Sequence, residues 1–440
     1  MKFKKLTSLA LSAVMMAGLM TGCGSKKSSS SDEIVTEITE PVEITFWHAM
    51  SGDLEKSLQN LTDKFMEENP NITVKLQNQS SYPDLQQKIT ATTASPDNLP
   101  TITQAYPHWM VNAMQDGLLT DLKPYIDNDK IGFKNYDDIL EGFRKASNID
   151  GKIYGIPFNK STEVIWYNKT VFDKLGLKVP TTYKELAETA KTITEKTGMV
   201  GCGFDSLQNF YTTYLKNEGV DFNKDTDVTS KESQAAANYY LDGVKEGYFR
   251  IAGTDMYLSG PFANETLAMY VGSNAGESFV KQGVGDKFEV GVAAYPGENV
   301  IQQGTDLYVF DNATPEQKTA AFEFLKFLCE TENQVTWASE TGYIPATQSA
   351  IDSKEYQESG SLVAANIKEI TSKKLYINEV AQGVDSAYNE AKTVLEDILS
   401  NTKSDVKAKL EQYKNTLKGI YESYFNYKKR CLKFNLRHLL

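Results

Sequence analysis

The sequence predicts an α/β fold in which a mostly parallel sheet carries helices on its faces. Hydrophobic residues make up 40% of the 440 residues and charged residues 24%, proportions typical of globular proteins. Strand-like and helical segments alternate from residue 42 onward, the pattern of a sheet covered by helices. At roughly 100–200 residues per domain, the length allows two or three compact units.

The first organised unit has the pattern strand, helix, strand. Val42 to Trp47 is rich in β-forming residues, and Asp53 to Glu68 carries apolar side chains at helical spacing. Asn69-Pro70-Asn71 ends this helix, and Ile72 to Leu76 alternates as a strand. Two strands joined by a helix pair in parallel, so this unit starts the sheet.

The alternation continues downstream. A helix through Leu85 and Ile89 leads to a short strand from Thr101 to Ala105. The later elements that we expect are an extended segment at Tyr154–Pro157, a strand at Glu163–Tyr167, helices at Asn168–Leu175 and Tyr183–Lys196, and a mostly helical region from Leu362 to Tyr421.

The N-terminal segment predicts export and a membrane anchor. Three lysines precede an apolar run of 15 residues, Leu6 to Met20, and small residues then lead to Cys23. We interpret residues 1–22 as a signal peptide, Cys23 as a lipidated N-terminus and residues 23–40 as the anchor with a flexible, serine-rich tether. Plain secretory cleavage is the alternative.

At the other end of the chain, residues 425–440 form a basic tail that we expect to fray.

Charge and motifs exclude several function classes. The formal net charge is -12, and -15 without the signal peptide, so phosphate backbones are repelled and nucleic acid is not an expected partner. Phosphate-binding glycine loops, H-E-x-x-H and G-x-S-x-G are absent from the sequence, and its three histidines and scattered cysteines indicate no metal or cofactor site. Carboxylates such as Asp53, Glu55 and Asp84 leave a glycosidase open.

Aromatic residues follow the strands at their carboxyl ends, where open α/β sheets bind ligands. Trp47 ends the first strand, Tyr82 follows the second, Tyr106 and Trp109 follow the third, and Tyr343 lies in a later turn. Flat apolar faces beside hydroxyl and amide groups suit a sugar ring, which stacks while its hydroxyls form hydrogen bonds.

Five motifs in order carry a family resemblance that covers about Glu43 to Tyr421. They are Ile44–Met50, Ser80–Asp84, Ile156–Asn159 with Trp166–Lys169, Phe262–Gly272, and Thr341–Pro345. Together they resemble the family 1 extracellular solute-binding proteins of ABC importers, and most of all the glycerol-3-phosphate-binding branch. The resemblance implies a two-lobed periplasmic-binding-protein fold, each lobe a mostly parallel sheet flanked by helices, with the ligand cleft between the lobes.

The resemblance also implies which residues contact the ligand. Positions that match the contacts of that branch are Tyr82, Ser161, Ser273, Gly304 and Tyr343, and the candidate set also includes Trp47, Tyr106 and Asp306.

Two expected features have no match. Phe204-Asp205-Ser206-Leu207 stands where a tryptophan pair is expected, and the segment from Gln382 to Tyr388 lacks the arginine that would hold a phosphate. Arginine is the natural bidentate phosphate ligand. Lys160 or Lys392 would have to replace it as point charges, so we favour a neutral carbohydrate over a glycerol phosphate compound.

The expected lobes are residues 41–152 with 303–342 and residues 153–302 with 343–424, joined by crossings near Ile153–Phe158, Asn299–Gly304 and Gly342–Ala346. We expect a monomeric, lipid-anchored binding protein on the outer face of the cell membrane that closes on its solute and delivers it to an ABC permease. It needs no cofactor and is not an enzyme. A secreted carbohydrate-active enzyme and a structural or adhesive lipoprotein are the alternatives.

Overall fold

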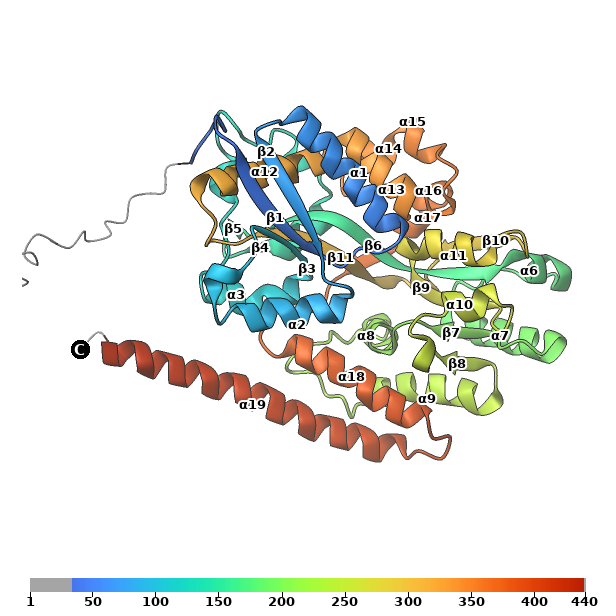
Figure 1. The fold of residues 1–440 in the computed structure, drawn as a ribbon. Helices are drawn as coiled ribbons and strands as arrows, with labels where there is room; N and C mark the ends of the chain where they lie inside the picture. The colour runs from blue at the N-terminus through green and yellow to red at the C-terminus, as the bar shows by residue number, and fades with distance from the viewer. Residues whose placement is uncertain (1–33, 439–440) are drawn as a thin grey trace, which may run out of the picture.

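The computed structural model describes the backbone of residues 34–438 and the side chains of residues 34–423. One sheet of ten strands forms its centre, with helices on both faces (Figure 1), which confirms the α/β class. The main path through the sheet is β2-β1-β3-β11-β6-β9-β7-β8, while β10 pairs with β6 and β12 with β11. The strands are β1 Val42–His48, β2 Ile72–Asn78, β3 Ile102–Ala105, β6 Gly155–Asn168, β7 Cys202–Phe204, β8 Phe249–Ile251, β9 Met269–Ser273, β10 Val290–Ala294, β11 Asn299–Val309 and β12 Lys374–Tyr376, and a separate hairpin joins β4 Asn148–Ile149 to β5 Lys152–Ile153.

The helices follow the strands in the expected alternation. They are α1 Asp53–Glu68, α2 Tyr82–Thr92, α3 Val111–Gln115, α4 Lys123–Ile126, α5 Glu141–Arg144, α6 Lys169–Leu175, α7 Tyr183–Thr197, α8 Leu207–Asn217, α9 Lys231–Glu246, α10 Ser259–Ala263, α11 Glu277–Val284, α12 Pro315–Leu328, α13 Thr331–Thr341, α14 Gln348–Asp352, α15 Lys354–Gln357, α16 Leu362–Ala365, α17 Ile367–Thr371, α18 Val384–Leu399 and α19 Val406–His438. The region from Leu362 to Tyr421, expected as mostly helical, also contains the short strand β12.

Side-chain caps define where several helices begin. The Ser81 hydroxyl accepts the Asp84 N–H at the start of α2, where Pro83 occupies the first turn. Thr314 and Gln317 form a reciprocal capping box at α12. The cap on α2 matters most for function, because it places Ser81 and Tyr82 at the carboxyl edge of the sheet.

Strands β6 and β11 run through both halves of the sheet. β6 pairs with β11 as far as Thr162 and with β9 from Glu163 onward, so the expected strand at Glu163–Tyr167 is the second part of one 14-residue strand. β11 pairs antiparallel with β6 and, from Asp306, with β3. The parallel pair predicted from the sequence, β1 with β2, lies on one side of these antiparallel crossing strands. A second parallel pair, β7 with β8, lies on the other side.

The first half of the sheet, β1 to β3, is covered on both faces. Ile44 and Phe46 of β1 face α1 and α12 in the largest core cluster. Trp47, which points the opposite way because side chains alternate along a strand, joins Leu85 and Ile89 of α2 in a smaller cluster. Helices α1 and α2 therefore pack their apolar faces against opposite faces of the same sheet.

The second half, which contains β7 to β10, is covered in the same manner. Phe262 of α10 and Val280 of α11 pack on one face and belong to the largest core cluster. The opposite face carries α7, α8, α9 and α18, whose core residues, including Leu186, Phe210 and Tyr240, form a second cluster. Helix α19 packs on α18 and α9, outside that layer (Figure 1).

Both chain ends differ from the expectation where they are described. The tether was expected to reach residue 40, but Ile34 and Ile38 pack against the core, and the Val35 carbonyl accepts the Thr319 hydroxyl at 2.6 Å. At the other end, the backbone of α19 stays helical to His438 instead of fraying after residue 424. The signal peptide and Cys23 lie outside the described residues.

Candidate functional site

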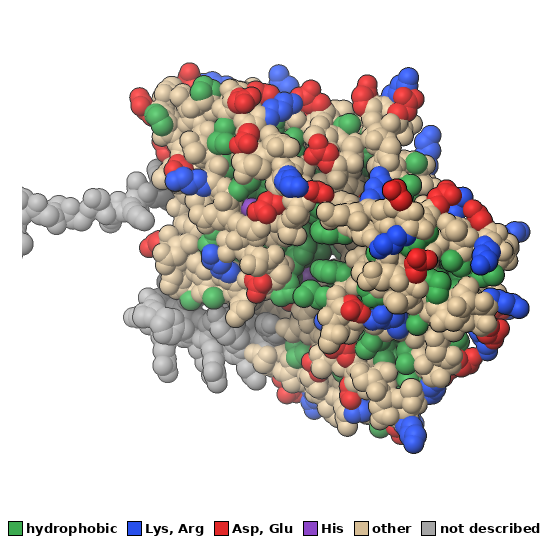
Figure 2. All heavy atoms as spheres, turned by 45° about the vertical axis from the view of Figure 1, so that its right-hand side comes forward, with side chains coloured by type: hydrophobic (Ala, Val, Ile, Leu, Met, Phe, Trp, Pro, Cys, Tyr) green, Lys and Arg blue, Asp and Glu red, His purple; other side chains and the backbone are tan. Residues whose placement is uncertain are grey.

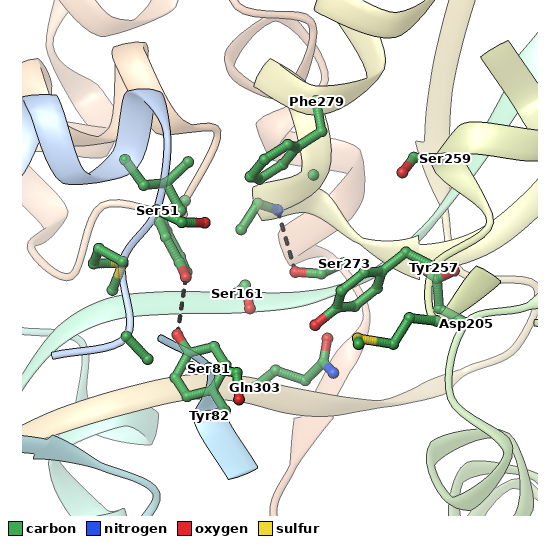
Figure 3. Close-up of a pocket in the computed structure, with 18 of the residues that line it drawn as sticks. Ser51, Ser81, Tyr82, Ser161, Asp205, Tyr257, Ser259, Ser273, Phe279 and Gln303 are labelled. Carbon is green, nitrogen blue, oxygen red and sulfur yellow. Dashed lines mark hydrogen bonds between the residues drawn. The ribbon is translucent and has the colours of Figure 1, made fainter. Parts of the chain in front are cut away.

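A cavity of about 400 Å³ lies between the two halves of the sheet, beside the crossing strands. Figure 2 shows hydrophobic side chains gathered around a hollow in the middle of one face, and Figure 3 shows most of the lining residues as sticks. The lining consists of Ala49, Met50, Ser51, Leu54, Ser80, Ser81, Tyr82, Tyr106, Ser161, Asp205, Met256, Tyr257, Ser259, Tyr270, Ser273, Ala275, Gly276, Phe279, Gln303, Gly304 and Tyr343.

Tyrosines form the wall on the side of the first half. The Tyr82 hydroxyl lies 3.3 Å from the Tyr343 hydroxyl and accepts the Asn159 amide N–H at 3.3 Å. The Tyr106 ring meets the Tyr82 ring edge-on, with centroids 5.7 Å apart. Burial raises the pKa of all three tyrosines, so their hydroxyls stay protonated and can donate hydrogen bonds to a solute.

The crossing strands form the floor of the cavity. Ser161 comes from β6, and Gln303 and Gly304 come from β11. Gly304 has φ +88°, and a Cβ there would lie 1.9 Å from the Asn159 carbonyl oxygen, so only glycine allows the two strands to approach this closely. Tyr343 stacks on buried Trp337, with ring centroids 5.5 Å apart and planes inclined by 12°.

Polar groups line the opposite wall. Ser273 ends β9, and its hydroxyl accepts the Ala275 N–H at 3.2 Å. Asp205 follows β7, and its Oδ1 accepts the Leu258 N–H at 2.6 Å. Burial raises the pKa of Asp205 to about 7. This wall therefore offers hydrogen-bond acceptors as well as hydroxyl donors.

Three exposed apolar side chains stand at the mouth of the cavity. The exposed fractions are 69% for Met256, 59% for Tyr257 and 43% for Phe279, and among the described large hydrophobic residues only Ile377 is comparably exposed. Met256 and Tyr257 lie in the turn before α10, and Phe279 lies on α11 (Figure 3). Exposed apolar groups clustered at one opening are typical of a ligand-binding surface.

Six of the eight residues predicted from the sequence line this cavity, and the structure brings them together from six separate segments of the chain. They are Tyr82, Tyr106, Ser161, Ser273, Gly304 and Tyr343. Trp47 and Asp306 do not belong to the lining.

Trp47 instead lies under α2. Its indole N–H donates to Gln77 Oε1 at 2.7 Å, and the Lys88 ammonium lies 4.4 Å from the ring centroid. Strand alternation explains the difference, because the residue that ends a strand still points to one face of the sheet and not along its edge.

Asp306 is completely buried behind the floor of the cavity, where it forms an ion pair with buried Lys160 and accepts the Ser147 hydroxyl. Lys160 is therefore already neutralised. Lys392, the other lysine considered for a phosphate, lies on α18 and faces Glu396 at 3.7 Å. Neither lysine lines the cavity.

Sequence reasoning missed several lining residues, including Ser51, Asp205, Tyr257, Phe279 and Gln303. Asp205 and Ser51 follow β7 and β1 at their carboxyl ends, and the same rule that selected Tyr82 applies to them. Tyr257 and Phe279 come from a turn and a helix, which no strand-end rule identifies.

Comparison with known proteins places the chain in a family. The model of the bacterial extracellular solute-binding protein family matches residues 60–364. The chain belongs to this family. The sn-glycerol-3-phosphate-binding periplasmic protein UgpB of Escherichia coli K12 is 28% identical over 338 residues, which cover 70% of this chain and 75% of UgpB.

Solved structures of such binding proteins share the fold. UgpB of Mycobacterium tuberculosis in complex with glycerophosphocholine has a TM-score of 0.76 at 20% identity, covering 87% of this chain and 99% of the other. The maltose-bound MalE3 of T. maritima has a TM-score of 0.74 at 19% identity, covering 86% and 99%. These proteins are two-lobed, so the fold expected from the resemblance is confirmed.

Membership of this family makes the chain a solute-binding protein and not an enzyme, and the cavity between the halves of the sheet is its candidate solute site. Within residues 34–438, none of the helices combines the length and apolar character that a membrane crossing requires. The described part of the chain also contains no group of His, Cys, Asp and Glu side chains suited to a metal ion.

Proposed function

We propose that this protein captures a neutral carbohydrate outside the cell and delivers it to the permease of an ABC importer. The choice of solute rests on the side chains that line the cavity. Those of the described residues include six aromatic rings, several hydroxyls and one carboxylate, but no Lys, Arg or His. Sugar rings stack on such faces, and their hydroxyls pair with such groups.

A glycerol phosphate is the second candidate, favoured by the 28% identity to UgpB. A phosphate monoester or diester needs charge-assisted hydrogen bonds, usually from arginine. The segment where that arginine was expected contains Asp385, which pairs with His108 at 3.1 Å. The side-chain chemistry of the cavity therefore supports the neutral solute, for which the maltose complex of MalE3 is a structural precedent.

Capture works by closure of the two lobes, residues 41–152 with 303–342 against residues 153–302 with 343–424. The strand pairing suggests that the first crossing lies near Thr162, slightly later than that division. The third crossing lies beside the first, because the Ile344 N–H donates to the Lys160 carbonyl at 2.7 Å. Rotation about these adjacent segments brings Tyr82 and Tyr106 towards Asp205 and Ser273 around the solute.

The anchor completes the proposal. Residues 1–22 are removed, Cys23 carries the lipid, and the following residues hold a monomeric body outside the membrane. The segment from Ile34 is already packed on the body, so only the residues before it act as the tether.

A ligand screen tests the proposed solute class. The mature protein is mixed with maltose, maltotriose, D-tagatose, sn-glycerol-3-phosphate and glycerophosphocholine, and melting temperature and calorimetric affinity are measured at low and high salt. We expect a neutral sugar to give the largest shift, with little dependence on salt. Preferential binding of a phosphate compound that weakens with salt would show the choice of solute to be wrong.

A further inference from the structure

We propose that Asp205 sets the charge selectivity of the cleft, accepting hydroxyl groups of a neutral solute and repelling a phosphate group. This inference rests on the proposed capture of a neutral carbohydrate and identifies the side chain that would make the cleft prefer one. It follows from the position of the carboxylate, its unused oxygen and its electrostatic surroundings.

Two backbone hydrogen bonds fix the position of Asp205. Its own N–H donates to the Val271 carbonyl at 2.9 Å, which extends the parallel pairing of β7 with β9 by one residue. The Leu258 N–H donates to Oδ1 at 2.6 Å and so ties the carboxylate to the turn that carries Met256 and Tyr257. The side chain is therefore held in the wall of the cavity and does not need to rearrange when a solute arrives.

The second carboxylate oxygen is unused. Among the described residues, none donates a hydrogen bond to Oδ2, although Asp205 lines the cavity (Figure 3). Gly272 packs directly against this oxygen, and a Cβ at that position would come within 2.3 Å of it. The glycine leaves room for the carboxylate, whose free oxygen can accept hydroxyl groups of a polyol.

Among the described side chains, no cation pairs with the carboxylate of Asp205. The titratable groups that face Asp205 from the elements packed around it are the phenols of Tyr240, Tyr257 and Tyr270 and the carboxyl of Glu163. Arg250, on the neighbouring β8, is engaged by Asp255. An anion that enters this wall meets an uncompensated negative charge, whereas a neutral hydroxyl finds an acceptor.

Asp205→Asn tests the proposal with a minimal change of shape. Asparagine keeps an oxygen for the Leu258 N–H but removes the charge. Glu265→Gln is the control, because it removes one exposed charge from the same half of the molecule and Glu265 does not line the cavity. Calorimetry measures the affinity of each variant for the best sugar of the screen and for glycerophosphoglycerol, whose single negative charge does not titrate between pH 6 and 8.

We expect Asp205→Asn to weaken the sugar and tighten the phosphodiester, changing the ratio of the two dissociation constants at least tenfold at pH 8. Glu265→Gln should change it less than threefold. Equal ratios in the two variants would overturn the proposal. A wild-type protein that prefers the phosphodiester contradicts the proposed solute, but a further tightening in Asp205→Asn would still support the charge selectivity.

The pH dependence supplies an independent readout. Because burial raises the pKa of Asp205 to about 7, the carboxyl gains a proton between pH 8 and pH 6. Wild-type affinity for the phosphodiester should increase severalfold over this range, and Asp205→Asn should abolish the increase. Glu163→Gln controls for the carboxyl that interacts with Asp205 and also has a raised pKa, and this variant should retain the increase. An increase that survives Asp205→Asn would overturn the proposal.

Discussion

The orientation of single side chains separates binding residues from core residues in this protein. Tyr257 and Trp47 are both aromatic residues close to the carboxyl edge of the sheet, but Tyr257 is 59% exposed at the cavity mouth and Trp47 is 5% exposed under α2. The two residues should therefore respond differently to truncation.

Trp47→Ala should lower the free energy of unfolding by about 3–5 kcal/mol and leave solute affinity nearly unchanged, because it opens a cavity in a core cluster. Tyr257→Ala should weaken the solute by about 1–3 kcal/mol and change stability by less than about 0.5 kcal/mol. Urea unfolding and calorimetry measure the two quantities. A loss of affinity in Trp47→Ala as large as in Tyr257→Ala would contradict this division.

Buried Glu163 makes stability depend on pH. Burial raises its pKa to about 8, despite the hydrogen bond from the Asn209 amide at 2.9 Å, and Oε2 has no hydrogen-bond partner. The folded state therefore binds this proton more tightly than the unfolded state, where the pKa is about 4.3. The contribution of Glu163 to stability is greatest below pH 4 and declines as pH rises to about 8.

Glu163→Gln should remove this decline. The variant should gain about 3–5 kcal/mol over the wild type at pH 8 and about 1 kcal/mol at pH 5, since only the ionised glutamate is penalised by burial. Thermal unfolding across this pH range provides the measurement. A gain that is the same at both pH values would show that the ionisation of Glu163 is not its cause.

Helix α18 connects the two halves of the molecule. It packs on α8, α9 and α19, while its first turn reaches the other half through Asp385. This carboxylate pairs with His108 at 3.1 Å and accepts the Gln86 amide at 2.9 Å. Burial alone would raise the pKa of Asp385, but the hydrogen bond and charge of His108 and the hydrogen bonds of Gln86 and Asn389 lower it below its usual value.

Asp385→Asn should therefore cost about 1.5–3 kcal/mol of stability at pH 7, the usual range for a hydrogen bond to a charged group. Because the folded-state pKa is lowered, this stability is present above the unfolded pKa of about 3.9 and is lost as pH falls through the folded value. Urea unfolding at pH 7 and near pH 2 should show the difference shrinking.

Glu396→Gln on the same helix is the control. It removes a solvent-exposed pair with Lys392 and should cost less than about 0.5 kcal/mol. If Glu396→Gln lowered the free energy of unfolding as much as Asp385→Asn does, the contact between the halves would stabilise the protein no more than a surface ion pair.

At the scale of the whole molecule, we propose that the chain crosses between the halves through β6, β11 and the segment after α13, which hydrogen-bond to one another. The three crossings lie together behind the cavity, an arrangement that suits hinge closure. Within the described residues, no helix is long and apolar enough to cross a membrane. We propose attachment through a lipid at Cys23.

Cys23→Ser should accordingly move the protein from the membrane fraction to the soluble fraction, because the lipid chains supply the binding energy for attachment. Fractionation followed by immunoblotting measures the distribution, and a Cys329→Ser variant, which changes a buried thiol of the body, is the control. Membrane retention of Cys23→Ser would contradict the lipoprotein proposal.

The sequence by itself determined the α/β class, the first strand-helix-strand unit, the family and six of the cavity residues. The class and the first unit follow from local periodicity and turn residues, and Tyr82, Tyr106 and Tyr343 follow from aromatic positions at strand ends and turns. Ser161, Ser273 and Gly304 follow only from the family resemblance of their motifs.

Only the tertiary structure decided the rest. It placed Trp47 in a core cluster and paired Lys160 with Asp306, because face and partner depend on which elements pack together. It also brought Tyr257, Phe279 and Asp205 to one cavity from segments far apart in the chain. A cavity between two halves is built from long-range contacts, and no local pattern encodes which side chains meet there.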